Sequence, residues 1–301
     1  MNDVHLTVLL ATRNGAAVLP RTLDGYRRAT APSVGWKIIV VDNGSTDDTQ
    51  QVIETFKASL PIEGLREPIP GKNRALNTGL DAVEGRLVIM TDDDSIPEPS
   101  FLVEWAKILK DDRGCELFGG SIAPLFDAPP PNWLLASRAS FALMFSERDL
   151  PEGPVPAEEI YGPNMAVASS VLSRGFRFDE DLGPNGDPEY PMGSETEFCR
   201  RVAAAGVRSW FVRDARVHHV VRPDQLTSAN WAKRSYRCGK GRAHQMWKRG
   251  DVVSAPGLSL TDLLGLVSPS RSRRLQSLSA RELARGFNDE CLRRLTEPPA
   301  P

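Results

Sequence analysis

Three short apolar runs in the first hundred residues each end in a cluster of polar side chains. The runs cover residues 4–11, 36–41 and 86–90, and segments with helical periodicity separate them. Near-continuous apolar runs of this length are typical of parallel strands that are buried on both faces of a sheet. Their alternation with helices predicts an α/β fold in which helices flank a Rossmann-like, mostly parallel sheet.

The polar clusters occupy the positions where the predicted strands end. They are Thr12-Arg13-Asn14, Asp42-Asn43-Gly44-Ser45 and Asp92-Asp93-Asp94. Because the carboxyl ends of parallel strands lie along one edge of a sheet, where α/β proteins bind ligands, we expect one shared site. Three adjacent carboxylates repel one another, and Mg²⁺ or Mn²⁺, which prefer oxygen ligands, would relieve that repulsion. The alternative is a helix N-cap at Asp94 or Ser95.

Composition places the chain among ordinary globular proteins. It has 301 residues, of which 41% are hydrophobic, and this content supports a full core. The four cysteines are far apart and lack metal-ligand spacing, so we expect free thiols and a cytoplasmic protein, with the inner face of the membrane as a variant of that location. No stretch approaches the roughly 18 apolar residues of a membrane span, and we expect no nucleic-acid partner.

Charge is distributed unevenly along the chain. Residues 222–301 carry 15 Lys and Arg against 7 Asp and Glu, whereas residues 1–221 carry 22 against 32. We therefore predict a main domain over 1–221 and a basic, mainly helical extension over 222–301. Aromatic and basic residues alternate over 231–249, as in a helix at a membrane surface. The alternative is a solvated helix face with a few buried aromatic side chains.

The polar clusters and the sequence between them resemble the family 2 glycosyltransferases, which have the GT-A fold. The residues that carry the resemblance are Val8–Asn14, Ile39–Asp47, Gly71–Gly79 and Ile89–Asp94. It implies an enzyme that moves a hexosyl or related group from a nucleoside diphosphate donor, with a UDP-sugar favoured, to a glycan, lipid or small-molecule acceptor. It also implies a nucleotide-sugar half, 1–123, and an acceptor half with an inserted loop region, 124–221.

The resemblance implies roles for individual side chains. Thr12, Asn14 and Asp42 would line the pocket for the base and ribose, and Asp92 and Asp94 match the outer positions of the family's Asp-x-Asp motif. The residues assigned to the nucleotide sugar are Thr12, Arg13, Asn14, Asp42, Lys72, Asn77, Asp92, Asp93 and Asn164. Those assigned to Mn²⁺ or Mg²⁺ are Asp92, Asp94 and His219. Turn formation by Asp42 and helix capping by Asn14 are the alternatives.

Two charged residues later in the chain are assigned to the chemistry. Lys72 opens a predicted helix, where a cation and the helix amides can meet phosphate oxygens. Arg74 is the other candidate for this cation, and a solvated lysine is the alternative for Lys72. The segment Met192–Arg201 resembles the acidic helix start in which inverting members place an Asp as general base. Glu195 occupies that position, which keeps the carboxylate and lengthens its reach by one methylene. The alternative is a capping box formed by Ser194 and Glu197.

The remaining assignments keep their alternatives. His219, preceded by His218, falls where some family members have a third metal ligand, and a structural histidine is the alternative. Asn164 lies in a segment that resembles the one beneath the acceptor site, and a turn is its alternative. Since Glu195 departs from the usual residue, a catalytically inactive nucleotide-sugar-binding partner or regulator of a transferase is the alternative function. A nucleotidyltransferase would need a Gly-rich loop after the first strand, and residues 11–15 hold a single glycine.

Overall fold

The chain forms two compact units in the computed structural model. The structure describes residues 4–111, 113–136, 141–251, 258–266 and 268–296. Unit 1 comprises residues 1–125, 145–180 and 194–220, and unit 2 comprises residues 126–144, 181–193 and 221–301. Two segments ahead of residue 221 thus belong to the second unit, and the domain boundaries drawn from the sequence stay a prediction.

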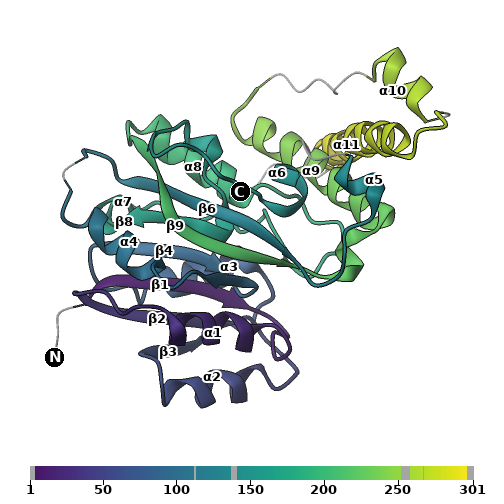
Figure 1. Ribbon diagram of the computed structural model, residues 1–301. Coiled ribbons are helices and arrows are strands. Elements are labelled where there is room, and N and C mark those ends of the chain that lie inside the picture. Colours follow the sequence, from purple (N-terminus) through teal and green to yellow (C-terminus); the bar gives the residue numbers. More distant parts are fainter. Residues whose placement is uncertain (1–3, 112, 137–140, 252–257, 267, 297–301) are drawn as a thin grey trace. The chain divides into compact units, whose positions relative to one another are not determined.

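Unit 1 is built on a mixed β-sheet whose strand order is β3-β2-β1-β4-β8-β6-β9-β5, with β7 paired to β9 (Figure 1). The strands are β1 (Val4–Thr12), β2 (Gly35–Asp42), β3 (Ile62–Arg66), β4 (Leu87–Asp92), β5 (Ser95–Pro97), β6 (Leu117–Phe126), β7 (Gly153–Pro154), β8 (Met165–Ala168) and β9 (Ser209–Val221). Strands β3, β2, β1 and β4 are parallel neighbours, as the alternating sequence predicted. The other pairs are antiparallel: β4 with β8, β6 with β8, β5 with β9, and β7 with β9. The prediction of a mostly parallel sheet therefore describes only the part of the sheet formed by β3, β2, β1 and β4. Antiparallel neighbours need no helical crossover, and the sequence after β4 lacks the regular alternation.

Helices cover both faces of the sheet. They are α1 (Leu19–Arg28), α2 (Thr49–Lys57), α3 (Lys72–Leu80), α4 (Phe101–Ile108), α7 (Ser169–Ser173) and α8 (Ser194–Ala204). One apolar cluster joins α1, α2 and α4 to Leu6, Val8 and Leu10 of β1, and the other joins α3, α7 and α8 to Leu9. Successive residues of β1 therefore enter opposite layers, which explains its continuous apolar sequence.

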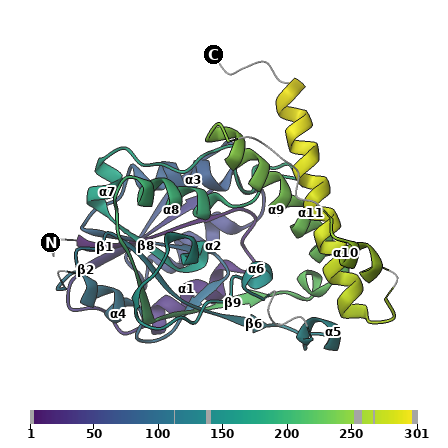
Figure 2. The ribbon, with the colours of Figure 1, turned by 90° about the horizontal axis from the view of Figure 1, so that it is seen from above.

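Unit 2 is mainly helical, as predicted for the carboxyl-terminal region. Its helices are α5 (Asn132–Leu135), α6 (Phe141–Phe145, whose last residue belongs to unit 1), α9 (Ser228–Lys248), α10 (Leu260–Gly265) and α11 (Arg271–Thr296). Helices α9 and α11 pack against each other (Figure 2). Glycines permit their close approach, because a Cβ on Gly239 would lie 2.0 Å from the carbonyl oxygen of Leu283.

Candidate nucleotide-sugar site

The sheet register brings the three polar clusters to one edge. Strand β1 lies between β2 and β4, with Thr12 opposite Asp42 and Ala11 opposite Asp92. The clusters come from loops that are far apart in the sequence, yet they follow three adjacent parallel strands. This edge is where a doubly wound sheet offers polar groups to a ligand.

The first two clusters are tied together by hydrogen bonds. Asn14, at φ 52°, donates its backbone N–H to Ser45 Oγ over 2.9 Å, and its Oδ1 accepts from the Thr46 backbone N–H over 2.9 Å. The buried Asp42 accepts from the Ser45 N–H over 2.9 Å and from Gln50 Nε2 over 3.0 Å, so it does form the turn that was its alternative role.

The structure also places Asn14 and Arg13 relative to the neighbouring elements. The capping alternative for Asn14 is wrong, because α1 begins at Leu19 with Val18 at its N-cap. Arg13, assigned to the nucleotide, is exposed beside the joined loops.

Within the aspartate triplet, Asp93 turns toward the protein interior. Its Oδ2 accepts from Thr12 Oγ1 over 2.6 Å, and its carbonyl oxygen accepts from Thr22 Oγ1 over 2.7 Å. Burial, followed by repulsion from Asp94, raises the pKa of Asp93 to about 7, although the Thr12 hydrogen bond opposes the shift. The capping alternative for the triplet is wrong, since α4 begins at Phe101, after a separate strand β5.

The outer carboxylates converge with a histidine. One ligand atom each from Asp92, Asp94 and His219 lies within 4.8 Å of the others. His219 reaches this place because β5 and β9 pair with Ser95 opposite His219, and its Nε2 is 3.3 Å from Asp94 Oδ1. Its Nδ1 lies 2.9 Å from the Phe145 carbonyl oxygen, which orients the ring as in many metal sites. Two carboxylates and an oriented imidazole fit Mn²⁺ or Mg²⁺.

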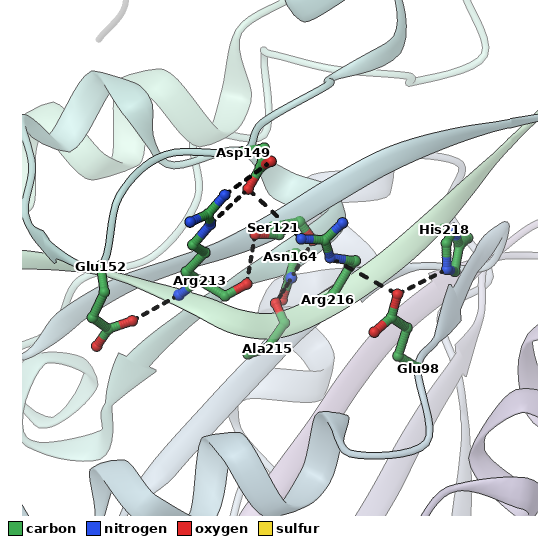
Figure 3. Close-up of polar contacts among 9 residues, drawn as sticks. All are labelled: Glu98, Ser121, Asp149, Glu152, Asn164, Arg213, Ala215, Arg216 and His218. Atoms are coloured by element: carbon green, nitrogen blue, oxygen red, sulfur yellow. Dashed lines mark hydrogen bonds and ion pairs between the residues drawn. The ribbon is translucent and has the colours of Figure 1, made fainter.

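Protonation of His219 is governed by two opposing effects. Burial alone would lower the pKa of its imidazole, but the hydrogen bond and charge of Asp94 outweigh burial and raise it. The neighbouring His218 takes no part in the cluster, because its Nε2 lies 3.1 Å from Glu98 Oε1 (Figure 3). Adjacent residues of a strand point to opposite faces, so one histidine of the pair meets the carboxylates.

Lys72 connects the metal-ligand candidates to the candidate base. Its Nζ lies 2.7 Å from Asp92 Oδ1 and 2.9 Å from Glu195 Oε1. Burial alone would lower the pKa of Lys72, but the two carboxylates outweigh it and raise the pKa. The solvated-lysine alternative is therefore wrong.

The surroundings of Glu195 are also defined. A Cβ on Gly162 would lie 2.4 Å from Glu195 Oε1, so the backbone of Gly162 borders the carboxylate directly. The capping-box alternative is not favoured, because α8 begins at Ser194 itself and Glu197 binds Arg201 Nε over 2.5 Å. Gly162 carries no signal in the sequence beyond its place in the segment that precedes Asn164.

The two assigned asparagines hold backbone segments. Asn77 Nδ2 donates to the Phe178 carbonyl oxygen over 3.0 Å, and its Oδ1 accepts from the Phe178 N–H over 2.9 Å. The buried Asn164 donates to the carbonyl oxygens of Ser121 over 2.9 Å and of Ala215 over 2.8 Å, which links β6 to β9 (Figure 3). Donor contact by either side chain stays a prediction.

Comparisons with known proteins first define the class. The Pyrobaculum calidifontis mannosyltransferase PcManGT, solved with GDP-Man and Mn²⁺, superposes with a TM-score of 0.59 at 18% identity and covers 100% of this chain and 79% of that one. The fold is therefore that of the GT-A glycosyltransferases, as the sequence predicted.

Sequence comparisons then identify similar proteins. The model "Glycosyl transferase family 2" matches residues 7–145. Glycosyltransferase AglE of Haloferax volcanii is 26% identical over 245 residues, which are 80% of this chain and 74% of that protein. A PGL/p-HBAD biosynthesis glycosyltransferase of Mycobacterium tuberculosis is 30% identical over 119 residues. The matched region is 38% of this chain and 46%, about half, of that relative. Residues 7–145 thus match the family 2 glycosyltransferases, and the named relatives support a glycosyltransferase enzyme.

Proposed function

We propose that the protein is a metal-dependent, inverting glycosyltransferase that moves a sugar from a nucleoside diphosphate, with a UDP-sugar favoured, to an acceptor hydroxyl. One observation carries the proposal. A carboxylate–histidine cluster suited to a divalent cation and a separate candidate base, Glu195, are joined through Lys72 over 2.7 Å and 2.9 Å. Both halves of a displacement reaction, leaving group and nucleophile, therefore have groups to serve them.

The donor side would be formed by the strand-end edge. Asp92, Asp94 and His219 would hold Mn²⁺ or Mg²⁺, which when bound would offset the charge on the leaving diphosphate. Lys72, the first residue of α3, adds a positive charge at a helix amino terminus, which favours phosphate oxygens. Asp42 and the Asn14 loop, which is hydrogen-bonded to the neighbouring loop, would form one wall of the pocket for the nucleotide base and ribose.

The acceptor side would be served by Glu195. Its carboxylate would take the proton of the acceptor hydroxyl while that oxygen attacks the anomeric carbon opposite the leaving diphosphate, so the configuration inverts. The backbone at Gly162 limits where this carboxylate can lie. A glycan, a lipid and a small molecule remain the candidate acceptor classes.

The test measures transfer and binding separately. Wild-type protein is given UDP- and GDP-sugars, Mn²⁺ and acceptor extracts, and we expect release of a nucleoside diphosphate. Glu195→Gln should lose transfer and retain nucleotide binding, whereas Asp94→Asn should lose metal-dependent nucleotide binding. Glu197→Gln, two residues along α8, is the matched control and should behave as wild type. Metal-dependent binding with no release from any donor would favour the inactive-partner alternative.

Contact with a membrane surface is a separate proposal that rests on the basic extension. Within the described residues, each helix is too short or too polar to cross a bilayer. Trp231 and Tyr236 are buried, so part of the aromatic pattern serves packing, but Trp247 is 40% exposed and precedes the basic residues Lys248 and Arg249. Salt-sensitive flotation with anionic vesicles would support peripheral docking at the inner face of the membrane, and its absence would remove it.

A further inference from the structure

A single ammonium group serves two carboxylates that the proposed reaction uses at different moments. Lys72 Nζ contacts Asp92, on the donor side, and Glu195, on the acceptor side. The Lys72 side chain is 23% exposed, and those of Asp92 and Glu195 are 22% and 21% exposed. A ligand entering this site therefore meets an ion pair that is already formed and partly shielded from water.

Main chain borders one side of the Glu195 side chain. A Cβ on Gly162 would lie 2.4 Å from its Oε1, 2.6 Å from its Cδ and 2.7 Å from its Cγ. Oε1, the oxygen that faces Gly162, is also the one that accepts from Lys72. While this hydrogen bond persists, that oxygen is occupied by an ammonium proton and is a poorer acceptor for a hydroxyl proton.

A donor diphosphate would compete for the same ammonium. It carries more negative charge and more acceptor oxygens than one carboxylate, and Lys72 stands at a helix amino terminus, where anions are stabilised. Asp92, the second partner of Lys72, belongs to the cluster that would face that diphosphate. Lys72 therefore lies where a partner exchange requires only a change of its side-chain direction.

We propose that Lys72 is a positioning residue that pairs with Glu195 in the donor-free enzyme and transfers to the diphosphate when the donor binds. Oε1 of the base is then released in the donor-loaded enzyme. This inference rests on the proposed function, because it assumes that Glu195 is the base and that the diphosphate lies beside Asp92.

Binding thermodynamics test the exchange without any need for turnover. Calorimetry with UDP, and with GDP, in the presence of Mn²⁺ is run on wild type, Glu195→Gln, Lys72→Met and the double variant. Since the wild type must break an ion pair to bind, Glu195→Gln should bind the nucleotide roughly fivefold tighter, the size expected for one partly exposed pair. Lys72→Met should bind more weakly, and in that background Glu195→Gln should have no further effect.

The controls separate the exchange from a general charge effect. Glu197→Gln removes a charge from the same helix and should leave affinity unchanged, because Arg201 holds that carboxylate. The exchange would be overturned if Glu195→Gln did not raise nucleotide affinity at all. It would also be overturned if Glu195→Gln still raised that affinity in the Lys72→Met background. If Lys72→Met does not fold, Lys72→Arg keeps a cation and must retain the tightening by Glu195→Gln. Failure of the wild type to bind either nucleotide with Mn²⁺ would instead refute the proposed function.

Discussion

Replacing Gly162 with alanine tests the placement of Glu195 by geometry alone. The new methyl carbon would lie 2.4 Å from Glu195 Oε1. Contacts between non-bonded heavy atoms are favourable at about 3.5 Å, so the carboxylate must move by about 1 Å. Gly162 is not among the glycines with positive φ, so alanine can adopt its backbone conformation.

The size of the effect follows from that displacement. A misplacement of about 1 Å at a reacting group costs on the order of 100-fold in rate. Because a general base acts in the chemical step, the loss should appear in kcat. Nucleotide affinity should change far less, since the nearest neighbours of the new methyl all belong to Glu195 and none to the metal-ligand candidates.

The assay is steady-state transfer with the UDP- or GDP-sugar from which the wild type releases nucleoside diphosphate, together with calorimetry of that nucleoside diphosphate and a thermal melt. Gly64→Ala in β3 is the matched control, because its new methyl would meet the side chains of Ile53 and Lys57, away from Glu195. An unchanged kcat in Gly162→Ala, with the fold intact, would refute the placement of the base.

Shortening the side chain at residue 195 should partly restore kcat in the Gly162→Ala variant. Glu195→Asp removes one methylene and draws the carboxylate back from residue 162, so it relieves the clash in Gly162→Ala. We expect Glu195→Asp to lower kcat in the wild-type background and to raise it in the Gly162→Ala background. If the fold losses in kcat of the two single variants simply multiply in the double variant, residues 162 and 195 do not act through contact.

Three further predictions concern protons, metal and packing. Asp93 in the folded protein has a pKa of about 7 against an ordinary 3.8, so the folded state holds this proton more tightly. The free energy of unfolding without metal should therefore fall as pH rises between those values. In denaturant unfolding, Asp93→Asn should show a smaller change of this free energy with pH. A proton on His219 competes with a cation, so Mn²⁺ affinity by titration should rise with pH through its raised pKa, and His219→Gln should flatten that rise. Gly239→Ala should destabilise the α9–α11 pair by about 2 kcal/mol, seen as a lower melting temperature, because its methyl would meet a carbonyl oxygen at 2.0 Å.

The strand-end clusters could be predicted because they depend on local sequence and one topological rule. Apolar runs indicated the strands, and parallel pairing of β1 with β2 and β4 places their ends together. The antiparallel half could not be predicted in this way, since short strands such as β5 and β8 carry no regular alternation with helices. The contact between Lys72 and Glu195 joins residues 123 positions apart, and no periodicity in the sequence encodes it.

The choice between His218 and His219 shows what kind of information the sequence lacked. Strand periodicity requires that the two side chains point to opposite faces, so the sequence could state that one of them, and not both, would meet the aspartates. Which one depends on the pairing of β9 with β5, a strand of three residues that directly follows the triplet. A shift of that pairing by one residue would exchange the two histidines. The backbone hydrogen bond from the Val220 N–H to the Asp94 carbonyl oxygen, 2.9 Å long, continues the pairing into the triplet itself. The identity of the third ligand candidate is therefore decided by main-chain register, before any side chain reaches a metal.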